Sequence, residues 1–85
     1  MATSSSQNIP LMSWDGDLTE NFKLYKHKLQ LYFDDENVKD KKSQARKILR
    51  SIGDNGLRLL YGSPFSTDDE QDPVKLFTFY DNQFP

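Results

Sequence analysis

The side chains that most often carry catalysis or bind metal are few in this sequence. The chain has 85 residues, one histidine and no cysteine, so disulfides, thiol catalysis and thiolate metal sites are excluded. His27 stands between Lys26 and Lys28 on the polar side of an expected helix, which is the usual setting of a solvated histidine. With no cysteine and one histidine, a zinc knuckle cannot form either.

Two acidic runs, residues 34–36 and 68–70, are the remaining candidates for metal chemistry. Their carboxylates are contiguous, whereas an EF-hand spaces its ligands along a loop and ends in a bidentate glutamate. Gly53 and Gly56 do not form a phosphate-binding pattern, and the sequence has no Asp-Thr-Gly or Asp-Ser-Gly protease signature. We therefore expect solvated acidic turns, no metal, no cofactor and no enzymatic activity.

The charged residues are unevenly distributed along the chain. Residues 39–50 hold six basic groups against one acidic group, a net charge of +5. Residues 63–85 hold five acidic groups against one lysine, a net charge of −4. Because the whole chain has a net charge of only −2, the two regions can attract each other within one chain or between chains.

Three interpretations of the basic run stay open: a solvated helix face, a contact between copies of the protein, or a contact with nucleic-acid phosphates. The acidic overall balance counts against a dedicated nucleic-acid binder. In the second interpretation, the candidate assembly face pairs basic residues with acidic residues further along the chain. These residues are Lys41, Lys42, Arg46, Lys47 and Arg50, with Asp68, Asp69 and Glu70 as their complement.

Composition predicts one small folded domain. Leu, Ile, Val and Phe make up about a quarter of the chain, which is above the range of disordered sequences. Residues 1–8 are small and polar, so we expect a disordered tail followed by a single helical domain over residues 9–85. The sequence shows no signal peptide, no myristoylation pattern and no membrane-spanning run, which predicts an intracellular protein without membrane contact.

Hydrophobic periodicity predicts a first helix over residues 18–34, capped by Asp17, and a second over 41–52, capped by Asp40. Leu24, Leu31 and Phe33 widen the apolar stripe of the first helix, so we expect burial on more than one of its sides. Gly53 stands where a helix-ending residue belongs. The acidic loop at 34–37 joins the two helices.

A third, short helix is expected over residues 55–61, capped by Asp54 and closed by Gly62. Its apolar stripe would contain Leu57, Leu60 and Tyr61. A polar loop follows, and a fourth helix begins with Asp72 as N-cap and Pro73 in its first position. The predicted fold is all-α, a compact bundle of four or five short helices with an extended N-terminal arm.

The arm contains the only tryptophan of the chain. Pro10 biases Ile9 toward extended geometry, so the arm should pack on the domain or on a partner. Trp14 either closes the entrance of the bundle or forms a contact site together with Ile9 and Leu11. Phe65, in the polar loop, is either a core anchor or an exposed contact.

Four motifs follow one another along the chain: Trp-Asp-Gly-Asp-Leu at 14–18, Leu-Gln-Leu-Tyr-Phe at 29–33, a basic helix ending in Ile52-Gly53, and Asn-Gly-Leu-Arg-Leu-Leu at 55–60. This order resembles the N-terminal capsid lobe of Gag proteins from gypsy-type LTR retrotransposons and of their domesticated relatives, such as Arc. The resemblance covers roughly residues 10–84, nearly the whole sequence.

The resemblance implies a structural protein that associates with other Gag or capsid copies, its own or those of a parent element, in the cytoplasm or within virus-like particles. It also implies a hydrophobic groove for short peptides near the N-terminal segment, with Ile9, Leu11 and Trp14 as the contact region. The second capsid lobe and the zinc knuckle of the family are missing from this sequence. The alternatives are therefore a peptide-binding adaptor, an inhibitor of particle assembly by the parent element, or a fragment of a longer Gag.

Overall fold

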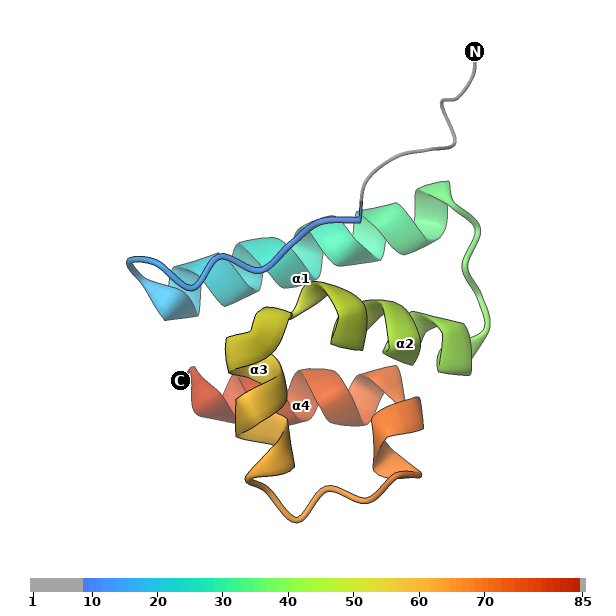
Figure 1. Ribbon diagram of the computed structural model, residues 1–85. Helices are drawn as coiled ribbons and strands as arrows, with labels where there is room; N and C mark the ends of the chain where they lie inside the picture. Colours follow the sequence, from blue (N-terminus) through green and yellow to red (C-terminus); the bar gives the residue numbers. More distant parts are fainter. Residues whose placement is uncertain (1–8, 85) are drawn as a thin grey trace.

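The computed structural model describes residues 9–84, which form four α-helices and one short 3₁₀ turn (Figure 1). An extended arm, residues 9–17, precedes the first helix, and no strand occurs between residues 9 and 84. The predicted all-α bundle with an N-terminal arm is confirmed, while the predicted tail at 1–8 lies outside the described residues. The elements are α1 (Leu18–Asp35), α2 (Lys41–Ser51), α3 (Gly53–Tyr61), η2 (Asp69–Gln71) and α4 (Pro73–Gln83).

Aspartates cap three of the four helices, at three of the four positions that the sequence predicts. The carboxylate of Asp17 accepts a hydrogen bond from a first-turn amide of α1 at 3.1 Å. Asp40 does the same for α2 at 2.9 Å, and Asp72 for α4 at 3.0 Å. Each bond satisfies an amide that has no partner within its helix, and Pro73 in the first turn of α4 has no amide hydrogen to satisfy.

The junction of α2 and α3 is a tight corner at Ile52 and Gly53. Gly53 has φ of +88°, in the left-handed region that glycine adopts without steric cost. α3 starts at this residue and carries no side-chain cap hydrogen bond. The prediction that Asp54 caps α3 is therefore wrong, because the chain turns directly from one helix into the next and Asp54 lies inside the first turn.

The core lies between α1 and the layer made by α2, α3 and α4 (Figure 1). Phe22, Tyr25 and Leu29 of α1 are each 2% exposed or less. Aromatic contacts link the two layers, since the ring of Phe22 lies 6.0 Å from that of Tyr80 and 5.4 Å from that of Phe84. The other buried apolar residues are Met12, Phe33, Ala45, Ile48, Ile52, Leu60 and Leu76.

Two tyrosine hydroxyls are buried in this core, and both are hydrogen-bonded. The hydroxyl of Tyr25 lies 2.7 Å from Oγ of Ser51, and the hydroxyl of Tyr80 donates to the carbonyl of Gly56 at 2.8 Å. Burial raises the pKa of Tyr25 to about 12, opposed in part by the bond to Ser51. Burial also raises the pKa of Tyr80. Both hydroxyls are thus neutral groups that tie helices together.

Three residues expected in the core are exposed. Leu24 and Leu31 are 53% and 51% exposed, and Tyr61 is 72% exposed. The prediction that α1 is buried on more than one side is wrong because the other helices all lie on one side of it (Figure 1). In α3, Gly56 and Leu60 face the core, and Tyr61 points away from it.

Candidate functional site

The five basic residues of the predicted assembly face all lie on α2. Lys42, Arg46 and Arg50 are exposed and follow at intervals of four, so they form one row along the helix, and Lys47 stands beside it. Lys41 is exposed in the first turn. The alternation of this row with the buried residues of α2 gives the helix one basic face and one apolar face.

None of the five basic residues forms an ion pair within the described part of the chain. The ion pairs of that part join Lys26 to Asp81 at 3.0 Å and Lys75 to Asp69 at 2.9 Å. The five cationic groups of α2 therefore have no carboxylate in contact among the described residues, and Lys42, Arg46 and Arg50 form one exposed row. Such a face attracts anionic partners or counterions.

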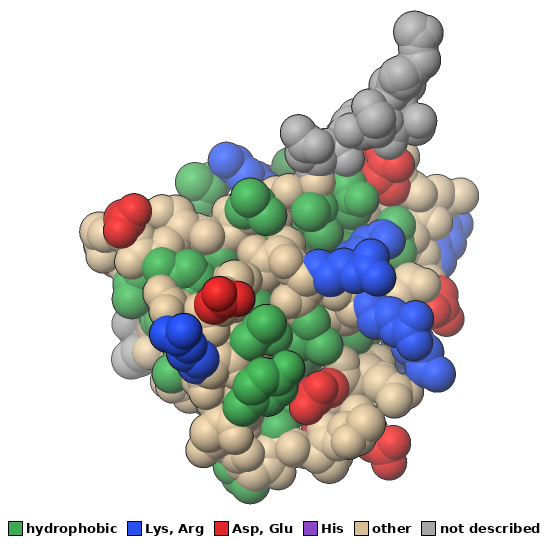
Figure 2. Space-filling model, viewed as in Figure 1, with side chains coloured by type: hydrophobic (Ala, Val, Ile, Leu, Met, Phe, Trp, Pro, Cys, Tyr) green, Lys and Arg blue, Asp and Glu red, His purple; other side chains and the backbone are tan. Residues whose placement is uncertain are grey.

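The predicted acidic complement lies close to α2 on the same molecule. η2, which begins at Asp69, packs against both α2 and α4. Figure 2 shows basic side chains grouped over the part of the molecule where α2 lies, with acidic side chains beside and below them. The structure thus brings the two halves of the predicted assembly face close together without pairing their charges.

Asp69 is the one member of the acidic group with a fixed role inside the chain. Its carboxylate contacts the ammonium group of Lys75 and accepts a hydrogen bond from the backbone of Ser66 at 3.4 Å. The hydrogen bond from Lys75 is the largest of the interactions that lower the pKa of this carboxyl below its usual value. Asp68 is exposed and Glu70 half-buried, and neither is in an ion pair.

The N-terminal arm is fastened to the corner between α2 and α3. The backbone amide of Met12 donates to the carbonyl of Ser51 at 3.1 Å, and the indole Nε1 of Trp14 donates to the carbonyl of Ile52 at 2.7 Å. The indole also meets the ring of Phe84 edge-on at 5.6 Å. Trp14 therefore closes the entrance of the bundle, which is one of the two roles expected for it.

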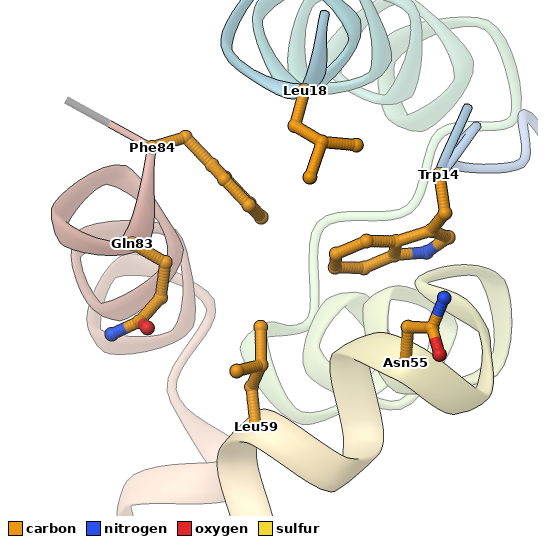
Figure 3. A pocket seen from close by; sticks show the side chains of 6 residues that line it. All are labelled: Trp14, Leu18, Asn55, Leu59, Gln83 and Phe84. Carbon is orange, nitrogen blue, oxygen red and sulfur yellow. The ribbon is translucent and has the colours of Figure 1, made fainter. Parts of the chain in front are cut away.

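The same indole forms a wall of an open pocket of about 390 Å³ (Figure 3). Figure 3 shows the side chains of Leu18, Leu59 and Phe84 directed toward the indole. The arm, α1, α3 and the end of α4 each contribute to the lining, which consists of Trp14, Leu18, Asn55, Leu59, Gln83 and Phe84. The pocket is an apolar depression with two amide groups, able to take a small apolar side chain.

Of the predicted peptide-contact residues, Trp14 alone is part of this lining. Ile9 packs against the core, and Leu11 is 72% exposed on the arm. Sequence reasoning did not connect Leu59 and Phe84 with the pocket, because they come from segments far apart in the chain. The one signal in the sequence was Leu59 itself, an apolar residue that does not belong to the buried stripe of α3.

The remaining candidates lie outside the basic row of α2 and outside the pocket at Trp14. His27 is exposed on α1, and residues 9–84 bring no three histidine or acidic side chains together in a way that could hold a metal ion. Phe65 is half-buried, with its ring 5.3 Å from that of Phe79, so it anchors the loop to α4. None of the helices between residues 9 and 84 is long and apolar enough to cross a membrane.

Comparison of the chain with protein-family models, with curated proteins and with solved structures gave no match.

Proposed function

We propose that this protein is a Gag-like capsid N-terminal domain that mediates protein–protein association in a retrotransposon-derived particle. The observation that carries the proposal is the exposed basic row of α2, whose charges have no carboxylate partner among the described residues, beside an acidic turn. The partners are other copies of the chain or capsid copies of a parent element. The cytoplasm, or particles assembled there, is the location that this function requires.

Adjacent basic and acidic surfaces suit a head-to-tail contact. The basic face of one copy can meet Asp68 and Glu70 of the next, while its own acidic turn stays free for a third copy. A contact of this type joins two different surfaces, so it continues into rings or shells. One exposed ion pair contributes only about 0.2–1 kcal/mol, so the contact depends on several pairs and weakens as salt rises.

The order of elements supports the family assignment. The resemblance implies an entry segment with tryptophan and glycine, a helix, a basic helix followed by Ile-Gly, and a short helix. The protein has these elements in this order. An alternative role for the same lobe is that of an inhibitor that enters particles of a parent element and blocks their growth.

The test is light scattering of the whole chain over a range of concentrations at low and high salt, followed by electron microscopy of the largest species. We expect oligomers larger than a dimer at low salt, and we expect them to dissociate at high salt. Arg46→Glu should prevent them, and Arg58→Glu, which reverses an exposed charge on α3, is the matched control. Assembly by Arg46→Glu equal to that of the unchanged chain would refute the role of this face.

Nucleic-acid binding is a less favoured role of the same face, because the neighbouring acidic turn repels phosphates. Fluorescence anisotropy with a labelled single-stranded RNA at low salt separates the two roles. Binding that falls steeply with salt and is lost in Arg46→Glu, with no protein assembly, would replace the association role.

A peptide-docking role is the second candidate, and the pocket beside Trp14 favours it. We expect short peptides with an aromatic residue to change the fluorescence of Trp14, the only tryptophan. Leu59→Ser, inside the pocket, should abolish the change, whereas Val74→Ser, an equally simple change at an exposed residue of α4, should not. If no peptide changes the fluorescence of Trp14, the peptide-docking role is refuted.

A further inference from the structure

The outer face of α1 carries a pattern that the proposed function does not use. Leu24 and Leu31 are about half exposed and stand seven residues apart, so they lie on the same side of the helix, away from the core. Charged or ionisable residues, all exposed, flank this apolar line: His27, Lys28, Asp34 and Asp35.

The flanking residues are arranged symmetrically about Leu31. At about 100° per residue, Lys28 and Asp35 lie on one flank of the line through Leu31, and His27 and Asp34 lie on the other. On one flank the ammonium group of Lys28 precedes Leu31 and the carboxylate of Asp35 follows it. On the other flank the imidazole of His27 precedes Leu31 and the carboxylate of Asp34 follows it. The outer face of α1 therefore changes from basic to acidic along its length, on both of its edges.

Such a face is complementary to itself when two copies meet antiparallel. A two-fold axis through Leu31 places the same flank of both helices on the same side, so Lys28 lies opposite Asp35 of the second copy. On the other flank His27 lies opposite Asp34 of the second copy. Symmetry repeats both pairings, and the two Leu31 side chains meet at the axis. We propose that the outer face of α1 binds the same face of a second copy in this antiparallel register.

Other alignments place like charges together. In a parallel pair, Lys23 and Lys28 of the two copies approach each other across the helix interface. In the antiparallel register that sets Leu24 against Leu31, the axis passes between His27 and Lys28, so the two Lys28 side chains meet on one flank and the two His27 side chains meet on the other. The charges thus select the register centred on Leu31.

The contact is small, since it uses one face of one helix. It falls at the low end of specific interfaces, so we expect a weak dimer whose population rises with protein concentration. It is a closed contact that stops at two copies, unlike the open contact proposed for α2. The contact itself does not depend on the Gag assignment. Only its use within a particle rests on the proposed function.

Charge reversal combined with sedimentation equilibrium of the whole chain tests the register. Lys28→Asp alone and Asp35→Lys alone should each weaken the dimer by about tenfold or more, because each places like charges together twice per dimer. The double variant should regain most of the affinity. A mixture of the two single variants should form a mixed dimer, since every facing pair in it is opposite in charge.

Three controls separate this contact from misfolding and from the α2 face. Far-UV circular dichroism must show each variant folded. Leu31→Ser should abolish the dimer and Val74→Ser, at an exposed apolar residue elsewhere, should leave it intact. Arg46→Glu should prevent larger species while leaving the dimer. A chain that stays monomeric at every concentration, or single variants that do not recover when combined, would overturn the proposal.

Discussion

Replacing Gly53 by alanine tests how the arm and the α2–α3 corner hold each other. Gly53 has φ of +88°, and a Cβ atom placed there would lie 3.2 Å from Nε1 of Trp14. That nitrogen donates to the carbonyl of Ile52 at 2.7 Å. The added methyl group therefore acts twice: it strains the backbone and it pushes the indole away from its hydrogen bond.

The two effects have separable magnitudes. An alanine in the left-handed region costs roughly 1–2 kcal/mol, and the stiffer unfolded chain reduces this penalty by only a small amount when the native conformation is unsuitable. Weakening the bond from Trp14 to Ile52 adds about 1 kcal/mol. Gly53→Ala should thus lower the free energy of unfolding by about 2 kcal/mol, or the melting temperature by roughly 10 °C for a chain of this size.

Gly16 is the matched control, because it has φ of +81° and no atom lies within 4 Å of the place that an added methyl group would occupy. Gly16→Ala should therefore cost the strain alone, about 1 kcal/mol. Urea denaturation followed by circular dichroism measures both variants, and the fluorescence of Trp14 reports whether the indole has moved. Equal losses for the two alanines, with unchanged fluorescence in Gly53→Ala, would refute the reasoning.

Two further predictions concern the core. Leu29→Ala should lower the free energy of unfolding by about 2–5 kcal/mol in urea denaturation, whereas Leu31→Ala, on the exposed face of the same helix, should change it by less than about 0.5 kcal/mol at monomeric concentrations; similar losses would contradict the burial. Stability should fall as pH rises from 10.0 toward about 12, because the unfolded chain releases the proton of Tyr25 before the folded chain does. Tyr25→Phe should make this fall shallower, as measured by urea denaturation at a series of alkaline pH values, and an unchanged slope would contradict the raised pKa.

Local signals in the sequence account for most of the helix boundaries. Asp17, Asp40 and Asp72 cap helices because a side-chain oxygen within three residues of free amides needs no distant partner to act. Gly53 marks a corner for a similar reason, since left-handed geometry is a property of the residue itself. The prediction for Asp54 failed because two helices share one corner, which depends on how both pack.

Local sequence patterns did not predict which surfaces are exposed or which lie next to each other. The spacing of Leu24 and Leu31 indicated an apolar face on the first helix, but their exposure depends on which elements cover that helix, and all of them pack on its other side. The basic row of α2 was visible in the sequence, whereas its position beside the acidic turn came from long-range packing. The pocket at Trp14 exists because Leu59 and Phe84, distant along the chain, converge on one indole. Residue types and short spacings determine helices and their charged faces, because these depend on neighbours a few positions away. Burial, pockets and adjacent surfaces depend on contacts between distant segments, which a single sequence does not encode in any local pattern.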